Sequence, residues 1–163
     1  MAYRARLYSF LLRLTRDEPL ARDLSQETWL RLAASARQLT PDTEPSAWLF
    51  RVARNVFLSQ RRWLVVHRAS LAALRFILPD RDEPSPFDRV VAGALELRLE
   101  RALAALPLRY REVVLLMSVE GFEAPQVAEM LGLSQAAVRQ RLSRGRAMLE
   151  RALADRNEPE SRP

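Results

Sequence analysis

The apolar and polar positions of the chain repeat with the period of an α-helix in almost every segment. Apolar residues recur three and four positions apart, the spacing that gathers them on one face of a helix. No stretch indicates a convincing strand. The pattern predicts an all-α fold, with helices over Tyr3–Thr15, Pro19–Ser35, Ser46–Trp63, Arg89–Leu106, Leu108–Val119, Ala124–Leu131 and Gln135–Ala154. A weaker continuation of the same pattern follows the third helix as far as Leu78.

The helical pattern breaks at residues 79–87. The first eight of these residues read PDRDEPSP, in which three prolines and four charged residues suit neither a helix nor a strand. We therefore expect two small helical domains, residues 1–78 and 88–156, joined by a flexible linker at 79–87. The polar tail, residues 157–163, is expected to be disordered.

The most specific local pattern is a helix-turn-helix within residues 124–149. Ala128 is small enough for two helices to cross closely, and Gly132 can adopt the left-handed backbone conformation of a tight turn. Ser134 is placed to cap the following helix. This pattern is typical of proteins that read duplex DNA.

The second helix of that motif has two different faces. At about 100° per residue, one face of residues 135–154 gathers Val138, Leu142, Gly145 and Leu149. The opposite face gathers Arg139, Gln140, Ser143 and Arg144 around two small alanines. Small residues let a helix enter the major groove, and Arg and Gln can contact base edges or phosphates. We interpret it as a recognition helix, in preference to an amphipathic helix with a solvated basic face.

The helix from Ser46 to Trp63 is basic and contains aromatic residues. Its wheel predicts a buried stripe of Trp48, Leu49, Val52, Val56 and Trp63. Its polar side supplies candidate contacts to single-stranded or melting nucleic acid: Arg51, Arg54, Asn55 and Arg62, interleaved with Phe50 and Phe57. A solvated basic face is the alternative on this pattern alone.

The helix from Pro19 to Ser35 has a different character. Leu20, Leu24 and Leu32 are expected to pack inwards. The outer face then carries acids, an amide and one leucine, namely Asp23, Gln26, Glu27 and Leu30. Such a face is unsuited to DNA and favours a protein partner, with a solvated face as the alternative.

The charged residues are distributed unevenly along the chain. The net charge is +6, all 26 basic residues are Arg, and residues 1–78 carry 13 Arg against 6 acids. Residues 79–97 carry 2 Arg against 5 acids, so an acidic spacer separates two basic blocks. A basic excess favours a polyanionic partner such as nucleic acid.

Several classes of function are disfavoured by the composition. The chain has no Cys and one His, so we expect no disulfide, no metal site and no cofactor. No arrangement of residues suits catalysis, and we expect a protein that is not an enzyme. The apolar runs near residues 7–12 and 71–78 are short or interrupted by Arg, so we expect no membrane insertion and a cytoplasmic location.

Four ordered motifs together resemble the sigma-70 family of RNA polymerase sigma factors, specifically its small extracytoplasmic-function (ECF) group. They are DLSQET at residues 23–28, WLFRVARN at 48–55, LPLRYREVVLL at 106–116 and EGFEAPQVAEMLGLSQAAVRQRLSRGR at 120–146. The resemblance implies region 2 in residues 1–78 and region 4 in residues 88–156. It also implies transcription initiation as the function, with RNA polymerase core and promoter DNA as partners and an anti-sigma factor as a further one.

The resemblance assigns roles to the three faces. The DLSQET helix of the family binds core polymerase, which implies that role for Asp23, Gln26 and Glu27. The WLFRVARN helix and the loop at 38–45 recognise the melted minus-ten element, which implies contacts from Arg51 and Asn55. The helix-turn-helix reads the minus-thirty-five duplex, which implies contacts from Arg139, Gln140, Ser143 and Arg144.

Two alternatives remain open at this stage. An autonomous helix-turn-helix regulator would bind duplex DNA without polymerase, but it would not need the WLFRVARN and DLSQET segments. A protein-binding adaptor with the same fold would have lost promoter opening, but it would not need the Arg-rich recognition face.

Overall fold

The computed structural model describes residues 2–35, 44–67 and 93–154, and within these ranges every regular element is helical. The all-α prediction is therefore confirmed for the described chain. The linker at 79–87, the tail at 157–163 and the continuation toward Leu78 lie outside it. The elements, in order, are α1 (Ala2–Thr15), α2 (Glu18–Ser35), α3 (Pro45–Val66), α6 (Ala94–Ala105), α7 (Leu108–Val114), a π-helical segment η2 (Leu115–Val119), α8 (Ala124–Leu131) and α9 (Gln135–Ala154).

Side-chain caps define where several helices begin. The Glu44 carboxylate accepts hydrogen bonds from the backbone N–H groups of Ser46 and Ala47, and Pro45 occupies the first turn of α3. Burial alone would raise the pKa of Glu44, but hydrogen bonds from the Ser46 hydroxyl and from these two N–H groups hold it below its ordinary value. The cap starts α3 one residue before the predicted position.

The predicted helix over Leu108–Val119 has both ends where expected, but its second part is π-helical and not α-helical. The chain leaves the α-helical register after Val114 and forms the wider π turn of η2, in which the Glu120 N–H donates to the Leu115 carbonyl. Gly121 follows with a φ of 80°, which a residue without a Cβ adopts readily. This path brings Phe122 back into the core.

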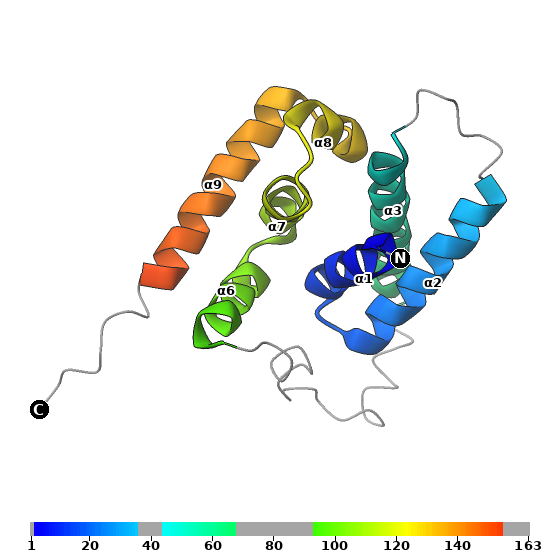
Figure 1. Cartoon of the computed structure of the whole chain (residues 1–163), viewed down its shortest axis with the longest axis horizontal. Coiled ribbons are helices and arrows are strands. Elements are labelled where there is room, and N and C mark those ends of the chain that lie inside the picture. Colours follow the sequence, from blue (N-terminus) through cyan, green and yellow to red (C-terminus); the bar gives the residue numbers. More distant parts are fainter. Residues whose placement is uncertain (1, 36–43, 68–92, 155–163) are drawn as a thin grey trace, which may run out of the picture.

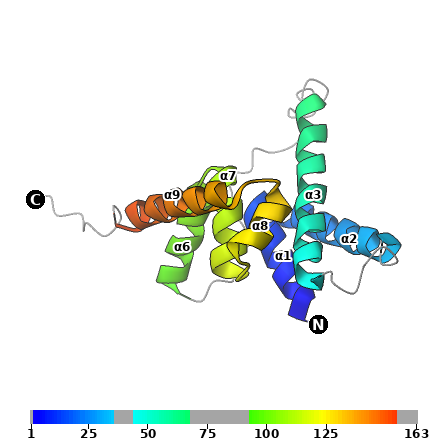
Figure 2. The ribbon, with the colours of Figure 1, turned by 90° about the horizontal axis from the view of Figure 1, so that it is seen from above.

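Helices α1 to α3 form one half of the molecule and α6 to α9 form the other, as Figure 1 shows. The two halves pack against each other, with α8 and α7 next to α3 and α1 in both views (Figures 1 and 2). One apolar core runs through both: the Phe50 ring meets Phe10 at 5.1 Å and Phe122 of the second half at 5.3 Å, centroid to centroid. The two halves therefore share a seam, which we define as the contact between α1 and α3 on one side and α6 to α8 on the other.

Candidate nucleic-acid and protein-binding surfaces

The helix-turn-helix forms as the sequence predicts. Gly132 ends α8 in the left-handed conformation, with a φ of 65°, and the Leu133 N–H donates to the Ala128 carbonyl across the turn. The Ser134 hydroxyl then accepts from the backbone N–H of Ala137 at 3.1 Å and caps α9. The turn fixes the direction in which α9 leaves α8.

The two faces of α9 are those predicted. Val138 is fully buried, and Gly145 lies directly against Val114 and Tyr110 of α7. The candidate minus-thirty-five contacts are all exposed on the other side, namely Arg139, Gln140, Ser143 and Arg144. A hydrogen bond from Arg144 lowers the pKa of the Tyr110 phenol, so this guanidinium is held at the edge of the face nearest α7. The outer flank of α9 in Figure 1 is free of other helices.

The polar face of α3 differs in part from the prediction. Arg51, Asn55 and Arg62 are exposed, as expected. Arg54 is not: its side chain is only 15% exposed and its guanidinium pairs with the Glu112 carboxylate of the second half at 2.9 and 3.3 Å. The cause is the seam, which covers the side of α3 that the wheel assigned to solvent.

The burial of the aromatic side chains of α3 also differs from the prediction. Phe50 and Phe57 are buried core residues, so they do not interleave with arginines on a nucleic-acid surface. Trp63, predicted to be buried, is 49% exposed. Its ring stacks on His67 with centroids 4.5 Å apart and 22° between the planes. This stacked pair extends beyond the core because the last turns of α3 project past the helices that cover its beginning (Figure 2).

Sequence reasoning missed the Trp63–His67 pair as a candidate contact. The two residues are four apart in a helix, which is the spacing at which side chains stack on one another. Arg61 and Arg62 precede them, and both are exposed. An exposed aromatic ring beside two arginines is a suitable platform for an unstacked base.

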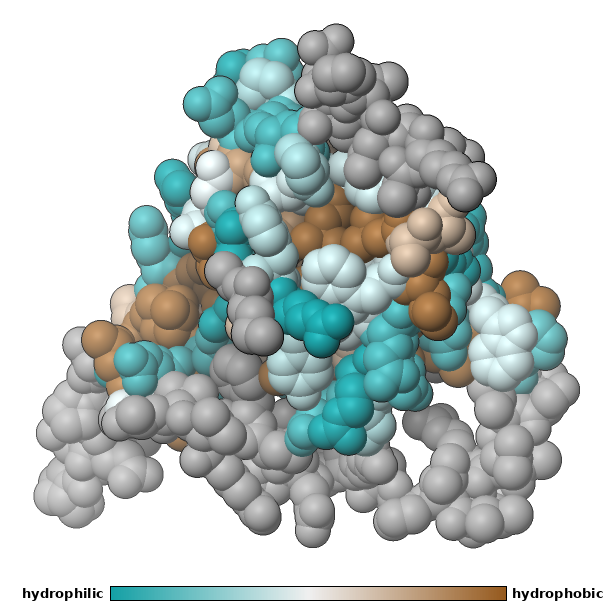
Figure 3. Space-filling view, turned by 45° about the vertical axis from the view of Figure 1, so that its right-hand side comes forward, coloured by the Kyte–Doolittle hydropathy of each residue, from teal (hydrophilic) through white to brown (hydrophobic). Residues whose placement is uncertain are grey.

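The outer face of α2 is as predicted. Asp23, Gln26 and Leu30 are exposed, and Leu30 keeps 68% of its surface open to solvent. Glu27 accepts from Arg31 at 2.6 Å within the helix. Of the three leucines expected inside, Leu24 is buried, and the other two are partly buried against the core. Figure 3, which turns the α2 side forward, shows hydrophobic atoms exposed among hydrophilic ones.

Other kinds of site find no support in the described ranges. Within residues 2–35, 44–67 and 93–154, no three His, Asp or Glu side chains are grouped so that they could hold a metal ion. No helix in these ranges is long and apolar enough to cross a bilayer. The candidate surfaces in these ranges are the exposed faces of α2, α3 and α9.

Comparison with known proteins agrees with this geometry. The model of sigma-70 region 2 matches residues 1–63 and that of sigma-70 region 4 matches residues 96–149. The probable RNA polymerase sigma factor RfaY of Xanthomonas campestris is 38% identical over 154 residues, and the match covers 89% of this chain and 37% of RfaY. The chain thus spans little more than a third of that relative.

Two further proteins match over more of their length. The ECF RNA polymerase sigma factor SigL of Mycobacterium tuberculosis is 32% identical over 137 residues, which are 83% of this chain and 76% of SigL. The sigma factor RpoE of Bartonella quintana, solved in complex with the anti-sigma factor NepR, superposes with a TM-score of 0.76 at 25% identity over 93% of this chain and 91% of RpoE. The chain belongs to the sigma-70 family of RNA polymerase sigma factors, in its ECF group.

Proposed function

We propose that the chain is a sigma factor that binds RNA polymerase core, directs it to specific promoters and initiates transcription from them. It acts by binding in the cytoplasm and catalyses no reaction itself. The observation that carries the proposal is the presence in one ECF-type chain of three separate exposed faces: an acidic and apolar one on α2, a basic one on α3 and a recognition face on α9.

The α9 face reads the minus-thirty-five duplex. Arg139, Gln140, Ser143 and Arg144 project from a helix whose other side is fixed to α7 and α8, so they enter a major groove as a rigid group. Ser143 is small and lets the helix approach the bases. The flanking arginines hold phosphates or guanine edges.

The α3 face binds the melted minus-ten strand. Its sequence from Pro45 to Val66 contains four arginines and no acid, so its field favours a phosphate backbone. Asn55 lies between Arg51 and Arg62 on the exposed side and can read the edge of an unstacked base. Unpairing a base costs a few kcal/mol, which stacking and polar contacts offset.

The α2 face binds core polymerase, and core sets the distance between the two DNA-binding faces. We keep the division into residues 1–78, a linker at 79–87 and residues 88–156 as part of this proposal. Two weakly specific domains gain affinity when a third body holds them at the right separation. An anti-sigma factor is a further proposed partner, since RpoE of Bartonella quintana is bound to one.

Reconstitution with purified core tests the function directly. We expect the chain to co-elute with core, to select promoters from a random DNA library and to support run-off transcription from the selected sequences. An autonomous regulator would bind DNA and not co-elute with core. An adaptor would co-elute and give no transcript from any selected promoter, and either result would contradict the proposal.

Truncating the α2 face should weaken core binding. In the Gln26→Ala/Leu30→Ala variant we expect about a 30- to 1,000-fold loss of affinity, because two central interface residues contribute on the order of 1–2 kcal/mol each. Fluorescence anisotropy of the labelled chain titrated with core measures it. Leu95→Ala is the matched control, because Leu95 is 70% exposed on α6 of the other half. Equal losses in the two variants would exclude the α2 face as the core contact.

Removing the Trp63 ring should impair strand opening. Stacking of a base on an aromatic side chain contributes about 1–3 kcal/mol, so Trp63→Ala should shorten the half-life of the open complex roughly 5- to 100-fold. Permanganate reactivity of unpaired thymines on a selected promoter reports it. Tyr3→Ala removes another exposed ring, 46% exposed on α1, and should change nothing. If Trp63→Phe fails to recover part of the loss, stacking is not the cause.

A further inference from the structure

Gly145 allows α9 to approach α7 closely. A Cβ at this position would lie 2.8 Å from the Val114 side chain and 3.4 Å from the Cβ of Tyr110, so a residue without a side chain suits the contact. Tyr110 lies at this contact and is only 7% exposed. The residue that precedes Gly145 is Arg144, one of the candidate minus-thirty-five contacts. The packing of α7 on α9 and the recognition face therefore meet at Tyr110 and Arg144.

The Tyr110 phenol connects this buried contact to the surface. A hydrogen bond from Arg144 is the main reason why the pKa of the phenol lies below its ordinary value, and the charge of Arg109 acts in the same direction, against the effect of burial. The Arg109 guanidinium also lies over the phenol ring, 4.7 Å from its centroid. Both arginines are exposed. One buried ring thus holds two surface guanidiniums, one from α7 and one from the recognition face.

Arg139, the other arginine of the recognition face, is held differently. Its guanidinium donates to the side-chain oxygen of Gln135 at 3.2 Å, four residues earlier in the same helix. Both side chains are exposed, and pairs of this kind within one helix are weak, so they fix a guanidinium only loosely. Arg144 is held from a neighbouring helix by a ring that is itself buried. It is therefore the better fixed of the two before DNA binds.

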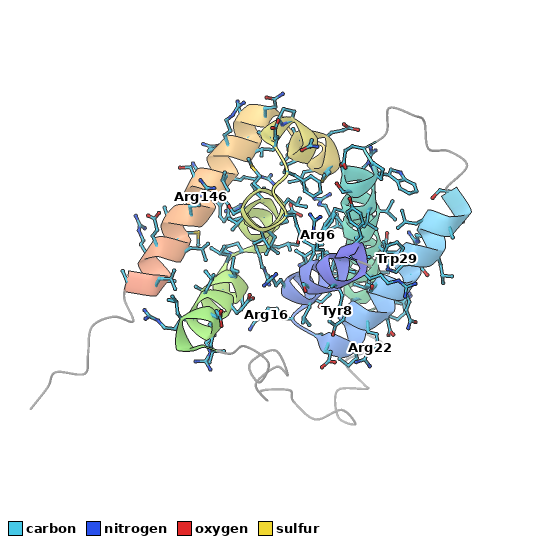
Figure 4. The ribbon with its side chains drawn as sticks, viewed as in Figure 1. Arg6, Tyr8, Arg16, Arg22, Trp29 and Arg146 are labelled. Atoms are coloured by element: carbon cyan, nitrogen blue, oxygen red, sulfur yellow. The ribbon has the colours of Figure 1, made fainter. Side chains whose placement is uncertain are left out.

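Two further arginines of α9 are contacted from the same neighbouring segment. Arg146, labelled on α9 in Figure 4, donates to the Ser118 hydroxyl of η2 at 3.2 Å. Arg141 lies 3.9 Å from the Glu112 carboxylate of α7, an anion that offsets its charge. A protonated phenol accepts a hydrogen bond without adding a negative charge. Arg144 is therefore held in place and keeps its full positive charge for DNA.

We propose that Tyr110 is a positioning residue for reading the minus-thirty-five element, and that its phenol presets the Arg144 guanidinium for a guanine edge in the major groove. The inference rests on the proposed function for the identity of the ligand of α9. A guanidinium has several N–H donors, so the phenol can hold it while other donors contact the base. A side chain that is already fixed loses less freedom on binding, which improves affinity about 3- to 10-fold over a free one.

A double-mutant cycle on the holoenzyme tests this coupling. Tyr110→Phe keeps the buried ring and removes only the hydroxyl, and we expect it to weaken binding to a selected promoter about 3- to 10-fold. The loss should disappear in an Arg144→Ala background and remain in an Arg139→Ala background. Tyr8→Phe removes the hydroxyl of a half-buried ring of α1, and this matched control should bind like wild type. A loss of equal size in both arginine backgrounds would overturn the proposal.

Promoters with single base changes separate positioning from a structural defect. Tyr110→Phe should lose preference only at the base pairs at which Arg144→Ala loses it. It should keep the preference at the base pairs that depend on Arg139. A loosened contact between α7 and α9 would instead lower the preference at every base pair of the element, and that result would also overturn the proposal.

Nuclear magnetic resonance of the free chain tests the positioning without polymerase. Relaxation of isotopically labelled arginine side chains measures how freely each Nε–H group moves. In wild type the Arg144 group should move less than that of Arg151, which is exposed in the last turn of α9, and in Tyr110→Phe the two should be alike. An Arg144 group that is already as mobile as that of Arg151 in wild type would refute the positioning. If the holoenzyme selects no promoter, the proposed function fails, while this measurement still decides whether Tyr110 holds Arg144.

Discussion

Replacing Arg139 and Arg144 together by alanine is expected to reduce promoter binding by the holoenzyme about 100-fold or more. Each good side-chain contact to a base edge contributes about 1–3 kcal/mol, and both guanidiniums lie on the exposed face of α9. Run-off transcription and filter binding on a selected promoter measure the effect.

The variant must also lose discrimination, because reduced affinity alone could come from fewer charges. On a promoter whose minus-thirty-five element is scrambled, the affinity of wild-type holoenzyme should fall to that of the double variant. The affinity of the double variant should be nearly the same on the intact and the scrambled promoter. Arg151→Ala, which removes an exposed charge from the last turn of the same helix, is the control and should retain discrimination. A double variant that still prefers the intact element would show that α9 is not its reader.

The parts of the structure that the sequence predicted are those set by local periodicity and caps. The α9 faces follow from the spacing of Val138, Leu142 and Gly145 within one helix, and the turn follows from Gly132 and Ser134. The exposed face of α2 is predictable for the same reason, since Leu20, Leu24 and Leu32 fall on the side of the helix that points inwards.

The parts that sequence reasoning missed depend on contacts between distant segments. Arg54 was assigned to solvent because a helical wheel describes one helix only. It cannot include the contact with Glu112, which lies 58 residues further along the chain. Phe57 is buried and Trp63 is exposed, opposite to the prediction, because the second half covers one end of α3 and leaves the other end free. The π turn of η2 could not be predicted, because its sequence of apolar residues is equally compatible with an α-helix.

Substituting Gly145 by valine should destabilise the second half by about 3 kcal/mol. A Cβ at this position would lie 2.8 Å from the Val114 side chain and 3.4 Å from that of Tyr110, so α9 must move away from α7. Overpacking of a close contact costs typically 1–3 kcal/mol, and a branched side chain lies at the upper end. Gly145→Ala should be milder, because the better helix propensity of Ala offsets about 1 kcal/mol. Ala147→Val, on the exposed face, is the control.

Urea unfolding of this variant also reports whether the two halves unfold together. The three Trp residues, Trp29, Trp48 and Trp63, all lie in the first half, so their fluorescence follows that half while circular dichroism follows both. Because the Phe50–Phe122 contact joins the cores, we expect Gly145→Val to shift the fluorescence transition together with the dichroism transition. If only the dichroism transition moved to lower urea, the seam would contribute little to the stability of the first half.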